Sequence, residues 1–226
     1  MKFDWAPLFI SLRSSLLALV LVFFLGIGAA RLLLYACRRT GWLADVLFSL
    51  PMVLPPTVTG YFLLILLGRN SPLGRFLGTR GISLIFTWQA TVAAAVVVSF
   101  PLMYRAARGS LEQVDQNLIH AARTLGMGEF RLFLKIMIPE AWPGIAAGTA
   151  LAFARALGEF GATVMLAGNI PGRTQTIPLA IYFATAGGNM RGAGIWALLI
   201  TLVSCLILGV MNFFNHRQNL IRRGNR

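Results

Sequence analysis

The chain has 226 residues, of which 57% are hydrophobic and only 12% are charged. Soluble globular domains average about 45–50% apolar and about 25% charged residues, so this composition favours lipid over water as the solvent. The net charge of +13 would suit nucleic-acid binding in a soluble protein. Here, however, the basic residues cluster between apolar runs and at the C-terminus, which is typical of membrane proteins. We therefore do not expect nucleic acid as a partner.

Five apolar segments are long enough to cross a membrane. A helix rises about 1.5 Å per residue, so about 20 apolar residues span a hydrocarbon core of about 30 Å. Backbone amides must be paired internally in hydrocarbon, which restricts these segments to helices. The sequence predicts an all-α membrane protein, a single domain over residues 1–226, with five transmembrane helices at about 16–34, 46–67, 82–103, 145–166 and 195–214.

The basic residues are divided unequally between the two sets of connections. Twelve Lys and Arg lie in residues 31–45, 103–143 and 215–226, and seven lie in residues 1–14, 68–81 and 167–193. Cytoplasmic loops carry the excess of Lys and Arg. We therefore expect a periplasmic N-terminus and a cytoplasmic C-terminus in a bacterial inner membrane, although Arg69, Arg75 and Arg80 oppose this bias.

The second predicted span contains three prolines, Pro51, Pro55 and Pro56. Proline removes a backbone donor and breaks a helix. Broken helices at membrane depth are tolerated where they are buried in protein or line a water-filled cavity. We interpret Pro55 and Pro56, with Thr57 and Thr59 after them, as part of a translocation pathway. The alternative is a static kink packed inside the bundle.

The connection between the third and fourth spans, at about residues 110–139, is predicted to be folded. Ser110 with Gln113 fits a capping box, and Asp115 can cap a following helix. Gly126 suits the left-handed position after that helix. Between them, apolar residues have the i, i+3, i+4, i+7 spacing of an amphipathic helix, at Leu118, Ala121, Ala122 and Leu125.

A second short helix is predicted from Glu129 to Ile138, ended by Pro139. The pattern by itself leaves two roles open for this connection. It forms either a surface helix that packs back onto the bundle or a helix that docks against another protein.

The fourth span carries two opposite charges, Arg155 and Glu159, four residues apart and therefore on one face of a helix. A charge at mid-membrane costs about 2.5–3.5 kcal/mol on insertion scales, so we expect the two to be paired or to face water. We interpret them, with Thr163 one turn further on, as a gate in the pathway. The alternative is a structural ion pair that holds helices together.

The chain has no phosphate-binding loop, because neither of its two lysines, Lys2 and Lys135, follows a glycine. Its histidines, His120 and His216, lie far apart without a cysteine or carboxylate cluster. We expect no catalytic, cofactor or metal site in this chain.

The run His120-Ala121-Ala122, three residues, Gly126, nine residues, Ile136-Met137-Ile138-Pro139 resembles the EAA motif of bacterial ABC importer permeases. That motif reads Glu-Ala-Ala, three residues, Gly, nine residues, Ile, any residue, Leu, Pro. The resemblance implies that residues 110–139 contain a coupling helix, which docks in a groove of a cytoplasmic ATPase that binds ATP and Mg. The residues carried over are Ala121, Ala122, Gly126, Ile136 and Pro139.

His120 stands where the family has Glu. An imidazole has an unperturbed pKa of about 6.5 and is mostly neutral in the cytoplasm. We therefore predict that the ATPase meets His120 with a neutral or acidic group.

Residues 50–60 and 155–182 resemble the molybdate branch of these permeases. Sulfate permeases share the Gly-Glu-Phe-Gly core at residues 158–161, whereas the Ala-Thr-Val-Met-Leu-Ala continuation is closer to molybdate permeases. The resemblance implies a homodimer that imports molybdate or tungstate by alternating access, with a periplasmic molybdate-binding protein meeting residues 167–194. The alternatives are a sulfate or thiosulfate permease, an ion-driven secondary transporter, for which no inverted repeat is evident, and a membrane scaffold.

Overall fold

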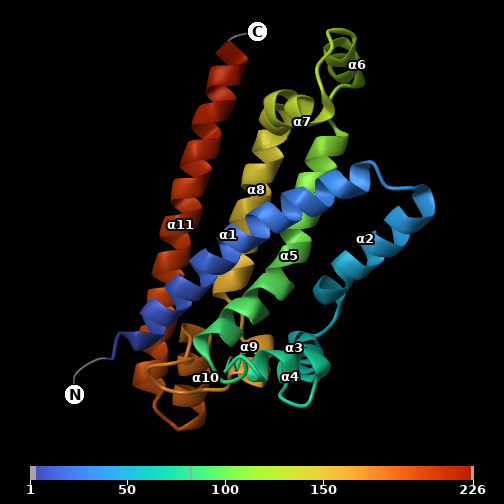
Figure 1. Cartoon of the computed structure of the whole chain (residues 1–226). Helices are drawn as coiled ribbons and strands as arrows, with labels where there is room; N and C mark the ends of the chain where they lie inside the picture. Colours follow the sequence, from blue (N-terminus) through green and yellow to red (C-terminus); the bar gives the residue numbers. More distant parts are fainter. Residues whose placement is uncertain (1–3, 82, 225–226) are drawn as a thin grey trace.

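The computed structural model describes residues 4–81 and 83–224, and all regular structure in them is helical. Four helices are long and apolar enough to span a membrane, and there are five when a bent pair is counted as one span (Figure 1). The predicted all-α bundle is thereby confirmed. The four are α1 (Ala6–Leu34), α5 (Trp88–Glu112), α8 (Ile138–Leu157), which continues the short helices before it, and α11 (Met190–Gly224).

The broken span consists of α2 (Arg38–Val53) and α3 (Pro56–Leu67). Their axes turn by 116° between Val53 and Pro56. Pro55 and Pro56 start α3, where a missing N–H costs nothing, while Pro51 is tolerated inside α2. The break predicted from the prolines is therefore present.

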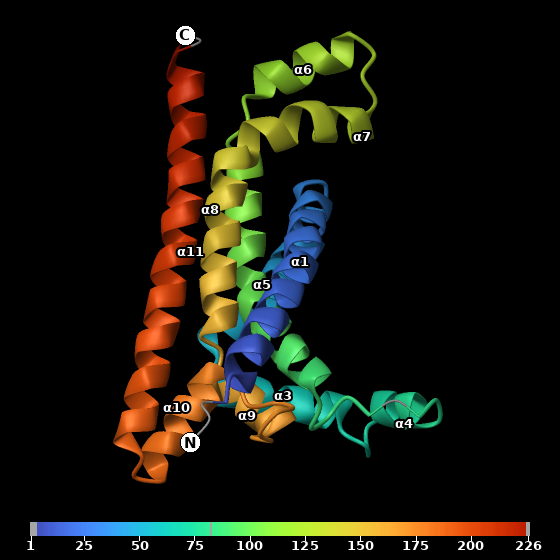
Figure 2. The ribbon, with the colours of Figure 1, turned by 90° about the vertical axis from the view of Figure 1, so that its left-hand side faces the viewer.

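The shorter helices gather at the two ends of the bundle. Helices α6 (Gln116–Thr124) and α7 (Glu129–Leu132) lie at the end that carries the C-terminus, and the others lie at the end that carries the N-terminus (Figures 1 and 2). We call these the C-terminal end and the N-terminal end. The latter group consists of α4 (Pro72–Gly78), α9 (Gly161–Ala167) and α10 (Ile177–Ala186).

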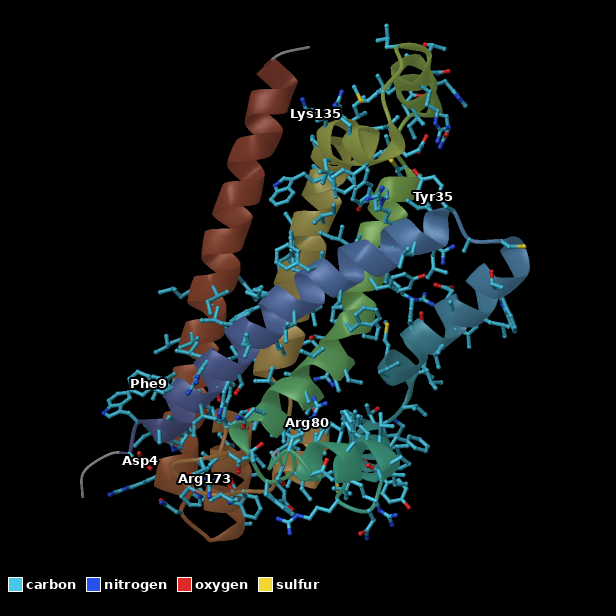
Figure 3. The ribbon with its side chains drawn as sticks, viewed as in Figure 1. Asp4, Phe9, Tyr35, Arg80, Lys135 and Arg173 are labelled. Carbon is cyan, nitrogen blue, oxygen red and sulfur yellow. The ribbon has the colours of Figure 1, made fainter. Side chains whose placement is uncertain are left out.

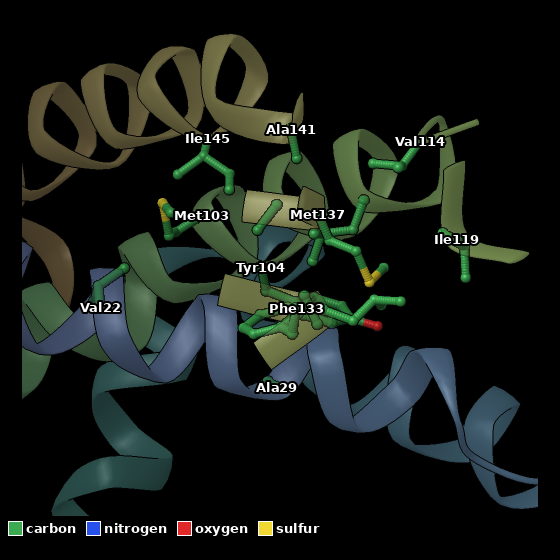
Figure 4. Packing of buried hydrophobic residues seen from close by; sticks show 14 of the residues in the cluster. Val22, Ala29, Met103, Tyr104, Val114, Ile119, Phe133, Met137, Ala141 and Ile145 are labelled. Carbon is green, nitrogen blue, oxygen red and sulfur yellow. The ribbon is translucent and has the colours of Figure 1, made fainter. Parts of the chain in front are cut away.

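The core lies where α5 packs against α1 and α8. Val22, Met103, Tyr104 and Ile145 are fully buried there (Figure 4). A β-carbon at Gly26 would lie 2.7 Å from Met103 Cγ, so only glycine permits this approach of α1 to α5. Small residues at such crossings are typical of membrane helices, which associate by close packing.

Several helix ends differ from the ends of the predicted spans. Helix α1 starts at Ala6 instead of Leu16, with Pro7 in its first turn. Helix α5 starts at Trp88 and not at 82, a residue outside the described part, and it continues past Met103 to Glu112. Ser110 is therefore inside a helix and makes no capping box, because its hydroxyl donates to the Ala106 carbonyl.

The fourth span differs most from its prediction. Pro139 ends no helix, because Glu129 to Leu157 forms one apolar helix of 29 residues that includes a π-helical turn, Phe133–Met137. Pro139 lies in the first turn after that π turn, where proline is tolerated. At the other end, the helix stops at Leu157 and not at 166. Residues 158–160 then separate α8 from α9.

The last span starts at Met190, five residues before its predicted start, and α11 continues beyond 214 to Gly224. The region 167–194 contains the ten-residue helix α10. Its start is tied to α1, since the Ile177 N–H donates to Ser11 Oγ at 2.8 Å.

Candidate coupling segment and translocation pathway

Helix α6 is a capped, nine-residue helix at the C-terminal end of the bundle. Asp115 Oδ1 accepts a hydrogen bond from the Asn117 N–H at 2.8 Å, which confirms Asp115 as its N-cap. Gly126 has φ of 76° and its N–H donates to the Arg123 carbonyl at 2.9 Å. Glycine adopts this left-handed conformation without strain, as the sequence predicted.

The apolar stripe of α6 is divided between two faces. Ile119 and Ala122 are buried against the bundle, whereas Leu118 is 46% exposed and Leu125 is 84% exposed. Ala121 is exposed beside them, as is His120. The buried face was thus predicted only in part, because Ile119 was missed. The outward face presents apolar side chains at i, i+3 and i+7, so α6 packs on the bundle and can also dock a partner.

A groove of about 590 Å³ borders α6. It lies between the end of α5, the start of α6 and the first turns of α8, and its lining includes Leu118 and two carboxylates, Asp115 and Glu140. A basic, apolar partner surface would match this groove and the outward face of α6 together.

A polar cluster joins α6 to the end of α1. The Arg123 guanidinium donates to both carboxylate oxygens of Glu129, at 2.8 and 3.2 Å, and the Tyr35 hydroxyl donates to Glu129 Oε2 at 3.1 Å. The guanidinium of Arg31 lies 4.5 Å from the ring centroid of Phe133. Burial and the Glu129 carboxylate raise the pKa of Tyr35, so its hydroxyl stays protonated and donates. Sequence reasoning missed this cluster, since its members are not neighbours in the chain.

The other residues assigned to coupling lie at different depths. Ile136 is half-buried in the π-helical turn and packs on the core, whereas Pro139 is exposed. Ile136 thus links the segment to the bundle interior, while His120, Ala121 and Gly126 are available to a partner.

The predicted pathway residues gather where α3 crosses α9. A β-carbon at Gly60 would lie 2.7 Å from Ala162 Cα, and one at Gly161 would lie 2.8 Å from Pro56 Cβ. Both contacts require glycine, so the two short helices pack backbone against backbone. Thr59 and Thr163 are buried at this crossing, whereas Pro55, Pro56 and Thr57 are exposed at the break of the second span.

Arg155 and Glu159 are paired, with Arg155 Nη1 2.7 Å from Glu159 Oε2. The contact is an ion pair without hydrogen-bond geometry, because Oε2 has no aligned donor among the described residues. Glu159 is 3% exposed, while the Arg155 side chain is 32% exposed. The expected shared helical face is wrong, since Glu159 follows the end of α8.

Glu159 also caps the next helix. Its Oε1 accepts a hydrogen bond from the Ala162 N–H at 2.7 Å, in the first turn of α9. A carboxylate at a helix N-terminus satisfies free N–H groups and the helix dipole. This buried side chain therefore ties Arg155 of α8 to the start of α9, which packs on α3.

No group of three or more His, Cys, Asp or Glu in residues 4–81 and 83–224 could hold a metal ion. The chain is thus a multi-pass α-helical membrane protein with a short capped helix, α6, at one end and a broken span in its bundle.

The family model described as "Binding-protein-dependent transport system inner membrane component" matches residues 22–218. The molybdenum transport system permease protein ModB of Escherichia coli (strain K12) is 45% identical over 208 residues, 91% of each chain. The putative molybdenum transport system permease protein YvgM of Bacillus subtilis (strain 168) is 40% identical over 205 residues, 90% of each chain.

An inward-facing structure of the MetNI methionine ABC transporter matches with a TM-score of 0.71 at 18% identity, over 94% of this chain and 93% of that chain. This likeness concerns the fold. The chain belongs to the family of binding-protein-dependent transport system inner membrane components, the permeases of ABC importers. It is a multi-pass inner-membrane protein, and its family implies a separate ATPase and a periplasmic binding protein as partners.

Proposed function

We propose that the chain is the permease subunit that imports molybdate, working as a homodimer with an ATPase docked on α6. The exposed apolar face of α6 carries this proposal, since a capped helix that is already packed on one side has a second face free for a partner. The ATPase supplies ATP and Mg binding, and this chain supplies the path. The same assignment puts the C-terminal end in the cytoplasm and the N-terminus in the periplasm, in agreement with the excess of basic residues.

The geometry offers a route from α6 to the pathway. Helix α6 is joined to Glu129 by Arg123, and Glu129 begins the 29-residue helix that ends at Leu157. At about 1.5 Å per residue, this helix is about 43 Å long. Glu159 then connects Arg155 to α9, which packs on α3. Displacement of α6 by the ATPase would therefore shift α9 and α3 together, which is the movement that alternating access needs.

Molybdate is the substrate that the relatives support, since the E. coli and B. subtilis proteins are both molybdenum transport permeases by name. Tungstate is the same kind of tetrahedral oxyanion and is proposed as a second substrate. A periplasmic molybdate-binding protein would deliver the anion to the N-terminal end, where residues 171–173 and most of residues 182–191 are exposed.

Reconstitution tests this proposal. The chain is placed in liposomes with its ATPase and binding protein, and uptake of labelled molybdate is measured with and without ATP. The matched control is an ATPase whose phosphate-loop lysine is replaced. We expect uptake that requires ATP and resists excess sulfate. Competition by sulfate at equal concentration would assign the chain to sulfate or thiosulfate, and uptake driven by an ion gradient without ATP would make it a secondary transporter.

A further inference from the structure

A pocket at the N-terminal end of the bundle has no role in the mechanism above. It has a volume of about 430 Å³ and lies between α1, the start of α5 and the connection from α9 to α10. Small-molecule sites occupy about 300–1,000 Å³, so this pocket is large enough for a small ligand. We call it the Arg13 pocket, after one of its two arginines, Arg13 and Arg173.

Both arginines are positioned by the fold. The Arg13 guanidinium lies 4.0 Å from the ring centroid of Trp88, which connects α1 to α5. Arg173 belongs to a turn in which its N–H donates to the Ile170 carbonyl at 3.1 Å. The wholly buried Thr174 holds that turn, because its hydroxyl accepts from the Ile170 N–H at 3.0 Å. Figure 3 shows Arg173 at the N-terminal end, opposite the end that carries Tyr35 and Lys135.

The charge of the pocket is not compensated. Its lining holds two arginines and no carboxylate, and in the described part of the chain neither guanidinium has an ion pair. The other polar side chains of the lining are neutral and include the exposed amide of Gln89. Guanidinium groups without a carboxylate partner in the lining of one cavity can bind carboxylate, phosphate and similar oxyanions.

We propose that the Arg13 pocket binds a tetrahedral oxyanion between Arg13 and Arg173. The anion is a free dianion such as molybdate or the phosphate of an anionic lipid headgroup. This proposal depends on the proposed function only for the identity of the transported anion. An open site with only two positive charges would bind the anion weakly and release it. A site of first capture at the periplasmic side requires such weak binding.

Trp88 is a built-in reporter of the site, because Arg13 stacks on its ring. The full chain is purified in uncharged detergent without ATPase, and tryptophan emission is followed during titration with sodium molybdate. Sodium chloride at equal ionic strength corrects for screening. We expect a saturable change that disappears in Trp88→Phe. Arg173→Gln, which leaves the reporter intact, should weaken the apparent affinity about tenfold, the loss of one charged hydrogen-bond partner.

Arg75→Gln is the matched control, since Arg75 lies on α4 at the same end but lines a different pocket. Titration in nanodiscs separates the two sources of the anion. A molybdate response that is lost in phosphatidylglycerol and kept in phosphatidylcholine assigns the pocket to a lipid phosphate, and a response in both assigns it to the free anion. No response to either anion, or a response unchanged by Arg173→Gln, overturns the site. Absence of ATP-dependent uptake with binding intact would overturn the proposed function instead.

Discussion

Glu129 and Arg123 form a two-pronged ion pair, with nitrogen–oxygen distances of 2.8 and 3.2 Å, across the turn that joins α6 to α7. Because Glu129 also accepts from Tyr35 at the end of α1, the pair connects α6 both to α1 and to the long helix that begins at Glu129. In Glu129→Ala we expect normal accumulation in the membrane and several-fold less molybdate imported per ATP hydrolysed. Both quantities are measured in liposomes. Arg131→Gln, an exposed neighbour, is the control, and equal coupling in the two variants would contradict the role.

Cross-linking tests which face of α6 meets the ATPase. The native cysteines, Cys37 and Cys205, are exposed and are first replaced by serine. A cysteine at the outward Ala121 or Leu125 should then form a cross-link to the ATPase, and one at the buried Ala122 should not. Capture through Ala122 alone, or no capture at all, would show that α6 docks differently or only packs on the bundle.

His120 offers a test of the partner's charge. It is exposed on α6, and we predict that the ATPase meets it with a neutral or acidic group. We expect His120→Glu to leave ATP-dependent molybdate uptake with the native ATPase unchanged or lower. A marked rise in coupled uptake would mean that the ATPase presents a basic group, contrary to the prediction.

Variants of the Arg155–Glu159 pair test whether it is a gate or a structural contact. Glu159→Gln leaves the guanidinium, whose side chain is 32% exposed, without its counter-charge, so we expect a loss of about 1–3 kcal/mol of stability. Thermal inactivation in detergent measures this loss. The double variant Arg155→Gln, Glu159→Gln removes both charges and should recover most of it.

Transport by the double variant then decides the role. If the pair is a gate, uptake stays low although stability returns. If the pair only holds helices together, uptake returns with stability.

Close packing of α3 on α9 makes Gly60 sensitive to a single methyl group. The β-carbon in Gly60→Ala would lie 2.7 Å from Ala162 Cα, and backbone cannot move aside as a side chain can. Overpacking of this kind costs about 1–3 kcal/mol, and we expect lower thermal stability and slower uptake. Gly28→Ala is the control, because Gly28 has open space in α1. Equal behaviour of the two variants would show that α3 and α9 separate freely.

Local signals were predicted well from the sequence. The spans and three local features each depend on a few adjacent residues. The break at Pro55 follows from the missing proline N–H, the cap at Asp115 from a side-chain acceptor, and the left-handed conformation of Gly126 from its missing β-carbon. The helix ends were predicted less well. Apolar residues continue on both sides of Gly158-Glu159-Phe160, so average hydropathy does not mark the point where α8 stops and α9 begins.

By itself, the sequence determined that this chain is a lipid-embedded helical bundle with a folded connection between its third and fourth spans. Only the tertiary structure decided that Ile119 packs inward, that Glu159 turns back to cap α9, that Tyr35 meets Glu129 across 94 residues, and that Arg13 and Arg173 share one pocket. The physical reason is that backbone conformation is set by near neighbours, whereas the environment of a side chain is set by helices that are distant in the chain.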